Sequence, residues 1–413
     1  MAALNSIAIE TVPTEVGAAS LAAPTAAYLH IPFCRRRCFY CDFPISVVGD
    51  RPPVGDHFGT IAEYVELLCQ EIQAVPLGQA DAALQTVFFG GGTPSLLTVE
   101  QFEQIMAALR SRFELAAAAE ISIEIDPNSF DQARLSGYLA AGVNRVSLGV
   151  QAFQTELLSA CGRTHSRSDV DAAIEMIRQV GLTNFSLDLI SGLPHQTMAQ
   201  WQESLDIAIS LAPMHLSVYD LTVEPGTSFD RWYEAGMQPL PTESTTAAMY
   251  RQAQQTLTQA GYQHYELSNY ARPGFECRHN RTYWENRSYY GFGMGAASYW
   301  NDQRFTRPRK RRDYYQWVQE FQQTGQIDCS ITPVAERLLD RLMLGLRLSE
   351  GLSLIALRAE FGNAAILRVL DCLEPHRQRG WVEQDDGRGI RLTDPEGFLY
   401  SNVVLSDLFK VLS

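Results

Sequence analysis

From about Ala27 onward, short β-rich runs alternate with amphipathic stretches of helical spacing, and this alternation constrains the fold more than any other feature. A crossover helix returns the chain to the same end of the sheet, so repeated strand–helix units build a parallel sheet. The runs that predict strands are Tyr28–Ile31, Thr86–Phe89, Ile121–Ile125, Arg145–Val150, Phe185–Ile190 and His215–Tyr219. The stretches that predict helices are Ile61–Ile72, Val99–Phe113, Asp131–Ala141, Ser168–Val180 and Met198–Leu211. We therefore predict an α/β fold built on a partial (β/α)6 barrel of the TIM type.

Residues able to carry chemistry gather where these predicted strands end. Cys34 follows the first strand, Gly90–Thr93 follows the second and Gln151 follows the fourth. Glu124 and Asp126 close the third strand, and Asp188 lies late in the fifth. The carboxyl ends of the strands meet at one face of a βα barrel, so a single site is expected there.

The residue pattern changes after about Pro241, where the sequence becomes aromatic and Gly-rich. It changes again at Pro333, from which the pattern is mostly helical. We expect a disordered leader over residues 1–24, a core barrel over 25–240 and a barrel extension over 241–330. Residues 331–413 are expected to form a smaller helical, winged-helix-like domain. Within it, Gly380–Leu392 reads as a β-hairpin.

Three cysteines form a C-x3-C-x2-C run, Cys34, Cys38 and Cys41, in a loop opened by His30-Ile31-Pro32-Phe33. Three thiolates can hold three irons of a [4Fe–4S] cluster and leave the fourth iron open to the amine and carboxylate of an amino acid. A zinc site is the alternative, but it would usually need a fourth Cys or His ligand. His30 is the candidate for that fourth ligand.

The bulk composition limits the classes of partner. The net charge of −14 and the pI near 5.1 argue against nucleic-acid binding, which depends on clustered cations. Eight cysteines in a chain of 413 residues predict a reducing cytoplasm rather than a secreted disulfide scaffold. No integral membrane segment is expected, because no run reaches about 18 uncharged apolar residues; peripheral membrane contact stays open. The short basic run of Arg307, Arg309, Lys310, Arg311 and Arg312 is interpreted as a solvated basic face, with contacts to propionates or an acidic partner as the alternative.

The segment Tyr28-x-His30-Ile31-Pro32-Phe33-Cys34-x3-Cys38-x-Tyr40-Cys41 resembles the cluster motif of the radical S-adenosylmethionine (SAM) superfamily. More narrowly, about residues 25–402 resemble the oxygen-independent coproporphyrinogen III oxidase family and its haem-chaperone branch, HemW. The resemblance implies a [4Fe–4S] cluster on the three cysteines, a bound SAM and, for that branch, haem as cargo.

The same resemblance implies a set of SAM contacts. Gly91, Gly92 and Thr93 correspond to contacts with the methionine amine and carboxylate, and glycines there let the backbone approach a ligand closely. The other implied contacts are Tyr28, Tyr40, Glu124, Gln151, Arg163 and Asp188. Buried polar side chains need partners, which SAM would supply. Internal ion pairing, such as Arg163 with Glu124, is the alternative.

Two motifs favour the chaperone branch over the oxidases. Phe43 stands where the oxidases carry a fourth cysteine, and His279-Asn280-Arg281-Thr282-Tyr283-Trp284 matches the branch motif H-N-x-x-Y-W. A neutral imidazole at His279 could ligate haem iron, while Tyr283 and Trp284 would offer flat faces to a porphyrin. Cys277 is the second candidate iron ligand. The alternative is a hydrogen-bonded histidine among packing aromatic residues.

Two further features bear on the branch. The oxidases carry a longer segment before the cluster than the short Ala-rich leader here. Gly291-Phe292-Gly293-Met294-Gly295-Ala296-Ala297-Ser298 resembles a family segment, G-x-G-x-G-A-H-S, but Ala297 replaces the usual histidine. We expect its glycines to serve a tight turn.

The leading hypothesis is a haem chaperone that carries a cluster and SAM and transfers haem to an unknown acceptor protein. The electron donor is also unknown, and no catalytic residue is assigned. The main alternative is an oxygen-independent coproporphyrinogen III oxidase of porphyrin biosynthesis. A zinc-stabilised nucleic-acid-binding protein is the second alternative.

Overall fold

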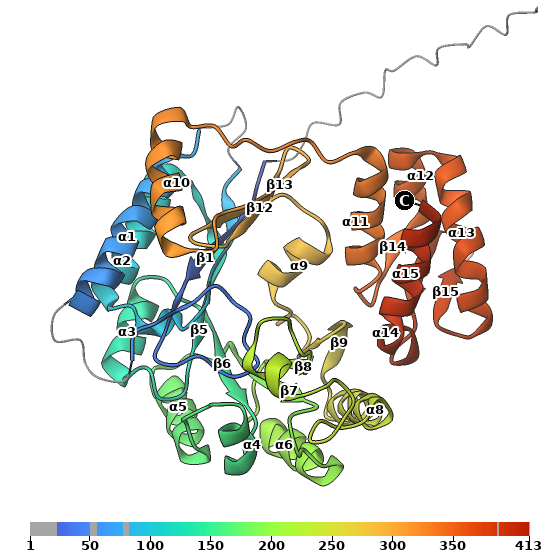
Figure 1. Cartoon of the computed structure of the whole chain (residues 1–413), viewed down its shortest axis with the longest axis horizontal. Helices are drawn as coiled ribbons and strands as arrows, with labels where there is room; N and C mark the ends of the chain where they lie inside the picture. Colours follow the sequence, from blue (N-terminus) through green and yellow to red (C-terminus); the bar gives the residue numbers. More distant parts are fainter. Residues whose placement is uncertain (1–22, 50–55, 77–81, 386–387, 413) are drawn as a thin grey trace, which may run out of the picture.

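A single twisted sheet organises the larger part of the chain in a computed structural model (Figure 1), which describes residues 23–49, 56–76, 82–385 and 388–412. Its strand order is β11-β1-β4-β5-β6-β7-β8-β10-β9. The bounds are β1 Ala26–Ile31, β4 Leu84–Gly91, β5 Leu115–Ile125, β6 Arg145–Gln151, β7 Phe185–Ser191, β8 His215–Asp220, β9 Gln263–Glu266, β10 Asn269–Ala271 and β11 Tyr290–Phe292. The predicted leader lies outside the described residues except for its last two positions.

The strands from β11 to β8 run parallel to their neighbours, whereas β10 pairs antiparallel with both β8 and β9. All six strands expected from the sequence are present, several of them longer at their ends. The edges β11 and β9 are not paired with each other, so the sheet curves into a barrel that stays open. The predicted fold class is confirmed.

Helices cover the outer face of this sheet (Figure 1). They are α1 Asp56–Ala74, α2 Val99–Arg112, α3 Gln132–Ala140, α4 Thr155–Ala160, α5 Arg167–Gln179, α6 Met198–Ser210 and α8 Glu243–Gln259. Helix α2 shows why they form: Phe102, Ile105, Met106 and Leu109 recur at helical spacing and are buried, and Thr98 begins the helix with a capping box. A large apolar cluster fills the space between these helices and the strands.

The Gly-rich segment after residue 290 forms the edge strand β11, paired with β1, before it turns into the hairpin of β12 (Ala297–Trp300) and β13 (Gln303–Thr306). The expected tight turn is therefore only part of its structure. Gly293 and Gly295 do occupy the turn, with φ of 98° and 74°. Gly291 is instead required by packing, because a Cβ there would lie 1.8 Å from the carbonyl oxygen of Ala297.

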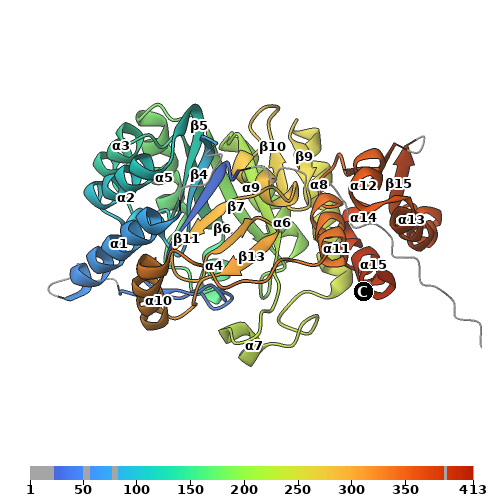
Figure 2. The same cartoon turned by 90° about the horizontal axis from the view of Figure 1, so that it is seen from above.

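The C-terminal part has its own apolar core and stands beside the barrel in both views (Figures 1 and 2). Its elements are α11 Val334–Gly345, α12 Leu354–Phe361, α13 Asn363–Gln378, α14 Glu396–Leu399, α15 Ser401–Leu412 and the small sheet of β14 Leu352–Ser353, β15 Val382–Asp385 and β16 Gly389–Leu392. Strands β15 and β16 pair antiparallel, as the hairpin prediction requires. Arg251 of α8 forms a bidentate pair with Glu396, at 2.6 and 2.8 Å, which ties this part to the barrel.

The basic run 307–312 is not a uniform solvated face. Arg309, Lys310, Arg311 and Arg312 are exposed as expected, but Arg307 is buried. Its Nε donates to Glu71 Oε1 at 2.6 Å, and the hydroxyl of Tyr314 in α10 (Arg311–Thr324) donates to Glu71 Oε2 at 2.6 Å. The expectation was wrong for Arg307, because the run passes under α10 before it reaches the surface.

The remaining short elements are β2 Phe33–Cys34, β3 Ser46–Val47, a 3-10 helix at Pro94–Leu96, α9 Arg278–Trp284 and α7 Ser228–Trp232, which projects from the barrel in Figure 2. Among the described residues, no helix combines the length and apolar character needed to cross a bilayer.

Candidate functional site

The loop that carries the three cysteines is closed at its base and held along its length by the protein itself. Strands β2 and β3 pair in parallel, and the amide of Val48 donates to the carbonyl of Cys34 at 2.9 Å. Within the loop, Arg37 Nη1 donates to the carbonyls of Cys41 and Phe43 at 3.1 and 3.2 Å. The loop conformation therefore does not depend on a ligand alone.

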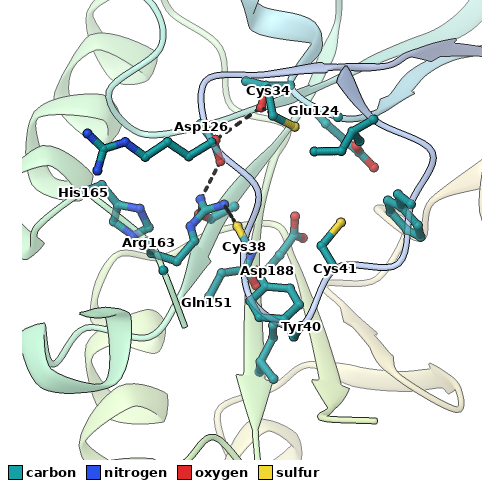
Figure 3. Close-up of a pocket in the computed structure, with 18 of the residues that line it drawn as sticks. Cys34, Cys38, Tyr40, Cys41, Glu124, Asp126, Gln151, Arg163, His165 and Asp188 are labelled. Carbon is teal, nitrogen blue, oxygen red and sulfur yellow. Dashed lines mark hydrogen bonds and ion pairs between the residues drawn. The ribbon is translucent and has the colours of Figure 1, made fainter. Parts of the chain in front are cut away.

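All three cysteine side chains open onto one cavity of about 390 Å³ at the carboxyl ends of the strands (Figure 3). This volume lies within the range of about 300–1,000 Å³ that small-molecule sites occupy. The predicted SAM contacts that line it with Cys34, Cys38 and Cys41 are Tyr40, Gly91, Gly92, Thr93, Glu124, Gln151, Arg163 and Asp188. Tyr28 does not line this cavity; it faces two neighbouring ones.

Two half-buried carboxyl groups face the cavity. Glu124 Oε2 accepts a hydrogen bond from the amide of Gly91 at 3.1 Å, and Asp188 Oδ1 accepts one from Ser147 at 2.8 Å. Burial, and secondarily the neighbouring charge of Asp188, raises the pKa of Glu124 to about 8; burial raises the pKa of Asp188 as well. A ligand with an ammonium or sulfonium group would relieve both desolvated acids, which fits SAM.

Arg163 forms the main ion pair of the site, but with a different acid from the one considered above. Its Nη2 lies 2.5 Å from Asp126 Oδ1 and donates to the carbonyl of Gly149 at 2.7 Å. The same guanidinium donates through Nη1 to Cys38 Sγ at 3.6 Å. The suggested Arg163–Glu124 pair is therefore wrong, and Glu124 keeps its carboxyl for the cavity.

Asp126 also lines the cavity, as its place at the end of a strand predicts, although the sequence assigned it no contact with SAM. Besides pairing with Arg163, its Oδ2 accepts a hydrogen bond from Thr93 at 3.4 Å. The available signal was the two-residue period of a strand, because Glu124 and Asp126 fall on the same face near the end of β5. Asp126 therefore links Thr93, in the glycine-rich segment, to Arg163 through its two carboxylate oxygens.

Gln151 is held in a rare backbone conformation. Its φ is 67°, in the left-handed region, and the pairing of β6 with β7 shifts register between Gly149 and Gln151. A non-glycine residue in this region is uncommon and is found preferentially at functional sites. The bulge ends β6 and turns the side chain of Gln151 toward the cavity (Figure 3).

The donor set fits a multi-iron cluster better than a single zinc ion. In the described part of the chain, no group of three or more His, Cys, Asp or Glu side chains converges on one ion. His30, the candidate fourth zinc ligand, uses both ring nitrogens elsewhere, with the Tyr28 hydroxyl at 3.1 Å and the Pro44 carbonyl at 3.0 Å. Three thiols around a shared cavity can instead enclose a larger cluster, whose soft sites thiolates prefer. Cys34, Cys38 and Cys41 would hold it.

The protonation of these thiols follows from their burial. Burial raises the pKa of Cys34 to about 12 and raises the pKa of Cys41 as well. Cluster binding must therefore displace protons. Two hydrogen-bond donors stabilise the negative charge of the resulting thiolates. Thr93 Oγ1 donates to Cys34 Sγ at 3.6 Å, and Arg163 donates to Cys38 Sγ.

The H-N-x-x-Y-W motif lies on α9, beside the barrel interior, and its histidine is fully engaged. His279 is 1% exposed; its Nδ1 shares a hydrogen bond of 2.8 Å with Thr86 Oγ1, and its Nε2 shares one of 2.8 Å with the Tyr283 hydroxyl. Burial lowers the pKa of His279 to about 3, so the ring is neutral. Cys277 is also buried, with its thiol donating to Glu120 at 3.7 Å and its pKa raised to about 12 by burial.

The two aromatic residues of the motif face different neighbours. Tyr283 lines a cavity beside the cysteine loop, whereas Trp284 lies under the guanidinium of Arg347, 5.8 Å from its ring centroid. Trp284 therefore packs toward the C-terminal part. Neither His279 nor Cys277 lines the cluster cavity. The structure brings the predicted cluster residues together with all the predicted SAM residues except Tyr28. Of the predicted haem residues, Cys277, His279 and Tyr283 line a separate cavity of about 230 Å³ in the barrel interior, and Trp284 packs elsewhere.

Family models match two parts of the chain. The radical SAM superfamily matches residues 28–208, and the HemN C-terminal domain matches residues 333–399. The first model covers the strands and loops that build the cluster cavity, and its family implies a [4Fe–4S] cluster and SAM. The predicted superfamily is therefore confirmed.

Relatives and solved structures agree with these models. The heme chaperone HemW of Synechocystis sp. is 48% identical, over 94% of this chain and 97% of that protein, and HemW of Bacillus subtilis is 35% identical, over 92% and 97%. The structure of coproporphyrinogen III oxidase (HemN) from Escherichia coli matches with a TM-score of 0.79 at 27% identity, over 93% of this chain and 90% of that one. The oxidase therefore shares the fold, while the chaperones share more of the sequence. The chain belongs to the HemW family within the radical SAM superfamily.

Proposed function

We propose that this protein binds haem and delivers it to an acceptor protein, with the cluster and SAM controlling that transfer. The observation that carries the proposal is the identity of 48%, over nearly the whole of both chains, with a relative named as a heme chaperone. A second support is Phe43, a side chain without a metal-binding atom where the oxidases carry a fourth cysteine; it lines the cluster cavity. The oxidase alternative is not favoured by these relatives.

Residues of the cluster cavity have separate roles in this proposal. Cys34, Cys38 and Cys41 hold the cluster, which supplies an electron for SAM when both are bound. Glu124 and Asp188 receive the positive groups of SAM, since they are half-buried carboxyls at the cavity wall whose pKa is raised by burial. Gly91, Gly92, Thr93, Tyr40 and Gln151 complete the contacts, and Arg163 fixes the position of Cys38 and Asp126.

Haem is proposed to bind next to this cavity, near the H-N-x-x-Y-W motif. Tyr283 lines the cavity beside the cysteine loop, and both Tyr283 and His279 line the cavity in the barrel interior. His279 supports Tyr283 through their shared hydrogen bond, while Trp284 and Cys277 contribute to packing. In this proposal the haem acceptor and the electron donor are both separate proteins.

We place the protein in the cytoplasm, because all eight cysteines are free.

The deciding experiment uses the full chain, reconstituted anaerobically with iron, sulfide and SAM. After loading with haem, it is mixed with the haem-free form of a haem protein, and transfer is followed by the Soret spectrum of the acceptor. A parallel sample receives coproporphyrinogen III. The proposal predicts haem transfer without formation of protoporphyrinogen; turnover of coproporphyrinogen, or a failure to bind haem, would contradict it.

A further inference from the structure

A second cavity of about 390 Å³ lies beside the cluster cavity, and its walls are largely aromatic. It is bounded by the end of the cysteine loop, by α9 and by the turn between β11 and β12. We call it the aromatic groove and define it by Tyr28, Phe43, Tyr283, Tyr289, Ala297 and Arg309. Two small residues, Gly295 and Ala296, also line it.

Phe43 connects the groove to the rest of the site. Its side chain is 52% exposed, although it is a large apolar residue, and it lines the cluster cavity, the barrel interior and the groove. Three positions that stood apart in the sequence thus meet at one surface: Phe43, Tyr283 and Ala297. Ala297 lines the groove, so its small side chain takes up less room at this wall than a histidine would.

The walls of the groove are fixed by hydrogen bonds behind them. His30 is buried and neutral, since burial lowers its pKa to about 4. Its Nε2 faces a carbonyl oxygen, Pro44 O, and so carries the proton; its Nδ1 therefore accepts from the Tyr28 hydroxyl. On the opposite wall, Tyr283 is held by His279 and packs edge to face on Tyr289, with ring centroids 4.7 Å apart. The aromatic faces are therefore arranged before any ligand arrives.

The rim of the groove carries positive charge in a chain whose net charge is −14. Arg309 Nη2 donates to the carbonyl of Asp42 at 2.9 Å, which holds the guanidinium at the edge of the cysteine loop. This contact uses one of the five N–H donors of the side chain. Lys310, Arg311 and Arg312 follow and are exposed. Asp42 lines the groove and Asp313 pairs with Arg312 at 3.5 Å, so four cations face two acids in this segment and the balance of charge favours an anionic ligand.

We propose that the aromatic groove is the haem site, with the macrocycle lying against Phe43 and Tyr283 and a propionate on Arg309. This inference rests on the proposed function and locates its cargo. A flat, apolar ring with two carboxylates matches aromatic walls and a cationic rim, and no iron ligand is needed for these contacts. Haem at this place would lie across Phe43 from the cluster cavity, so the state of that cavity could control its release.

The test measures two probes, haem and metal-free protoporphyrin IX, on the cluster-loaded full chain. Phe43→Ala should weaken the binding of both probes by about 3- to 10-fold. The two factors should be equal, because the lost contact involves the porphyrin ring and not the iron. Arg309→Gln should weaken both by a similar factor that shrinks at high salt. Ala297→Trp should fill the groove and abolish binding. Iron content and thermal unfolding establish that each variant is folded and loaded.

Matched controls are Phe409→Ala, an exposed aromatic residue on α15, and Arg312→Gln, a neighbouring exposed cation; both should bind like the unchanged protein. The inference is overturned if the unchanged protein binds haem and the three groove variants bind it equally well. In that case the proposed function stands and the site lies elsewhere. If the unchanged protein binds neither probe, the proposed function itself fails.

Discussion

The cluster cavity and the H-N-x-x-Y-W helix are both built around polar groups in the barrel, yet their polar groups behave in opposite ways. Around the cavity, three thiols and the acids Glu124 and Asp188 point into open space. On α9, His279 has partners on both ring nitrogens and Cys277 lies against Glu120. The cavity groups have protein partners too, but they also line an open space where a ligand can reach them, whereas both ring nitrogens of His279 are taken up by protein partners. The H-N-x-x-Y-W motif can therefore distinguish the chaperone branch by shaping the wall of a cavity, without ligating iron.

The largest expected effect tests whether the cluster cavity binds the cluster. Cys38→Ser should abolish cluster assembly, because the remaining two thiols cannot hold three irons. Iron content and visible absorption after anaerobic reconstitution measure it. Cys372→Ser, at a half-buried cysteine of the C-terminal part, should retain full iron. A Cys38→Ser protein with an intact cluster would remove the cavity from its assigned role.

The next largest effect tests the structural role of His279 on α9. His279→Ala removes two buried hydrogen bonds and leaves a void, so the free energy of unfolding should fall by about 2–4 kcal/mol. The cluster content should stay unchanged, while haem and metal-free protoporphyrin bind more weakly because Tyr283 loses its support. Denaturant unfolding and titration of both probes measure this. If His279 were an iron ligand, only haem would be affected, and its Soret spectrum would change.

A smaller effect follows from the pKa of Glu124. Burial raises this pKa to about 8, so between the ordinary carboxyl pKa and pH 8 the unfolded chain binds fewer protons than the folded one. The stability of the ligand-free protein should therefore decrease as pH rises through that range, and Glu124→Gln should flatten the decrease. Thermal unfolding at a series of pH values measures it. Glu320→Gln, on the exposed side of α10, should leave the slope as it is; an unchanged slope in Glu124→Gln would contradict the assignment.

The smallest effect separates the two aromatic residues of the motif. Trp284 packs under Arg347 and not on the aromatic groove, so Trp284→Leu should change haem affinity by less than about twofold, an energy below roughly 0.5 kcal/mol. The measurement is the same Soret titration, with Tyr283→Leu as the comparison that should weaken binding. Equal losses in the two variants would mean that both rings contact haem.

The sequence predicted the barrel well because its strands carry a strong local signal. The period of apolar residues and the turn residues at strand ends are both local, and they located β1, β4, β5, β6, β7 and β8 and the cavity at their ends. What it missed depends on distant partners. The pairing of β11 with β1, the burial of Arg307 against Glu71 and the choice of Asp126 rather than Glu124 by Arg163 each join segments that are far apart in the chain. The satisfaction of His279 by Thr86 is of the same kind.

The pairing of β11 with β1 also has a consequence for synthesis on the ribosome. Ala27 pairs with Tyr290, so one side of β1 stays an open edge until most of the chain has emerged. An unpaired edge strand can recruit other chains and aggregate. Nascent or truncated chains that end before Tyr290 therefore expose the strand that leads into the cysteine loop, and the cluster loop can reach its final support only late in translation.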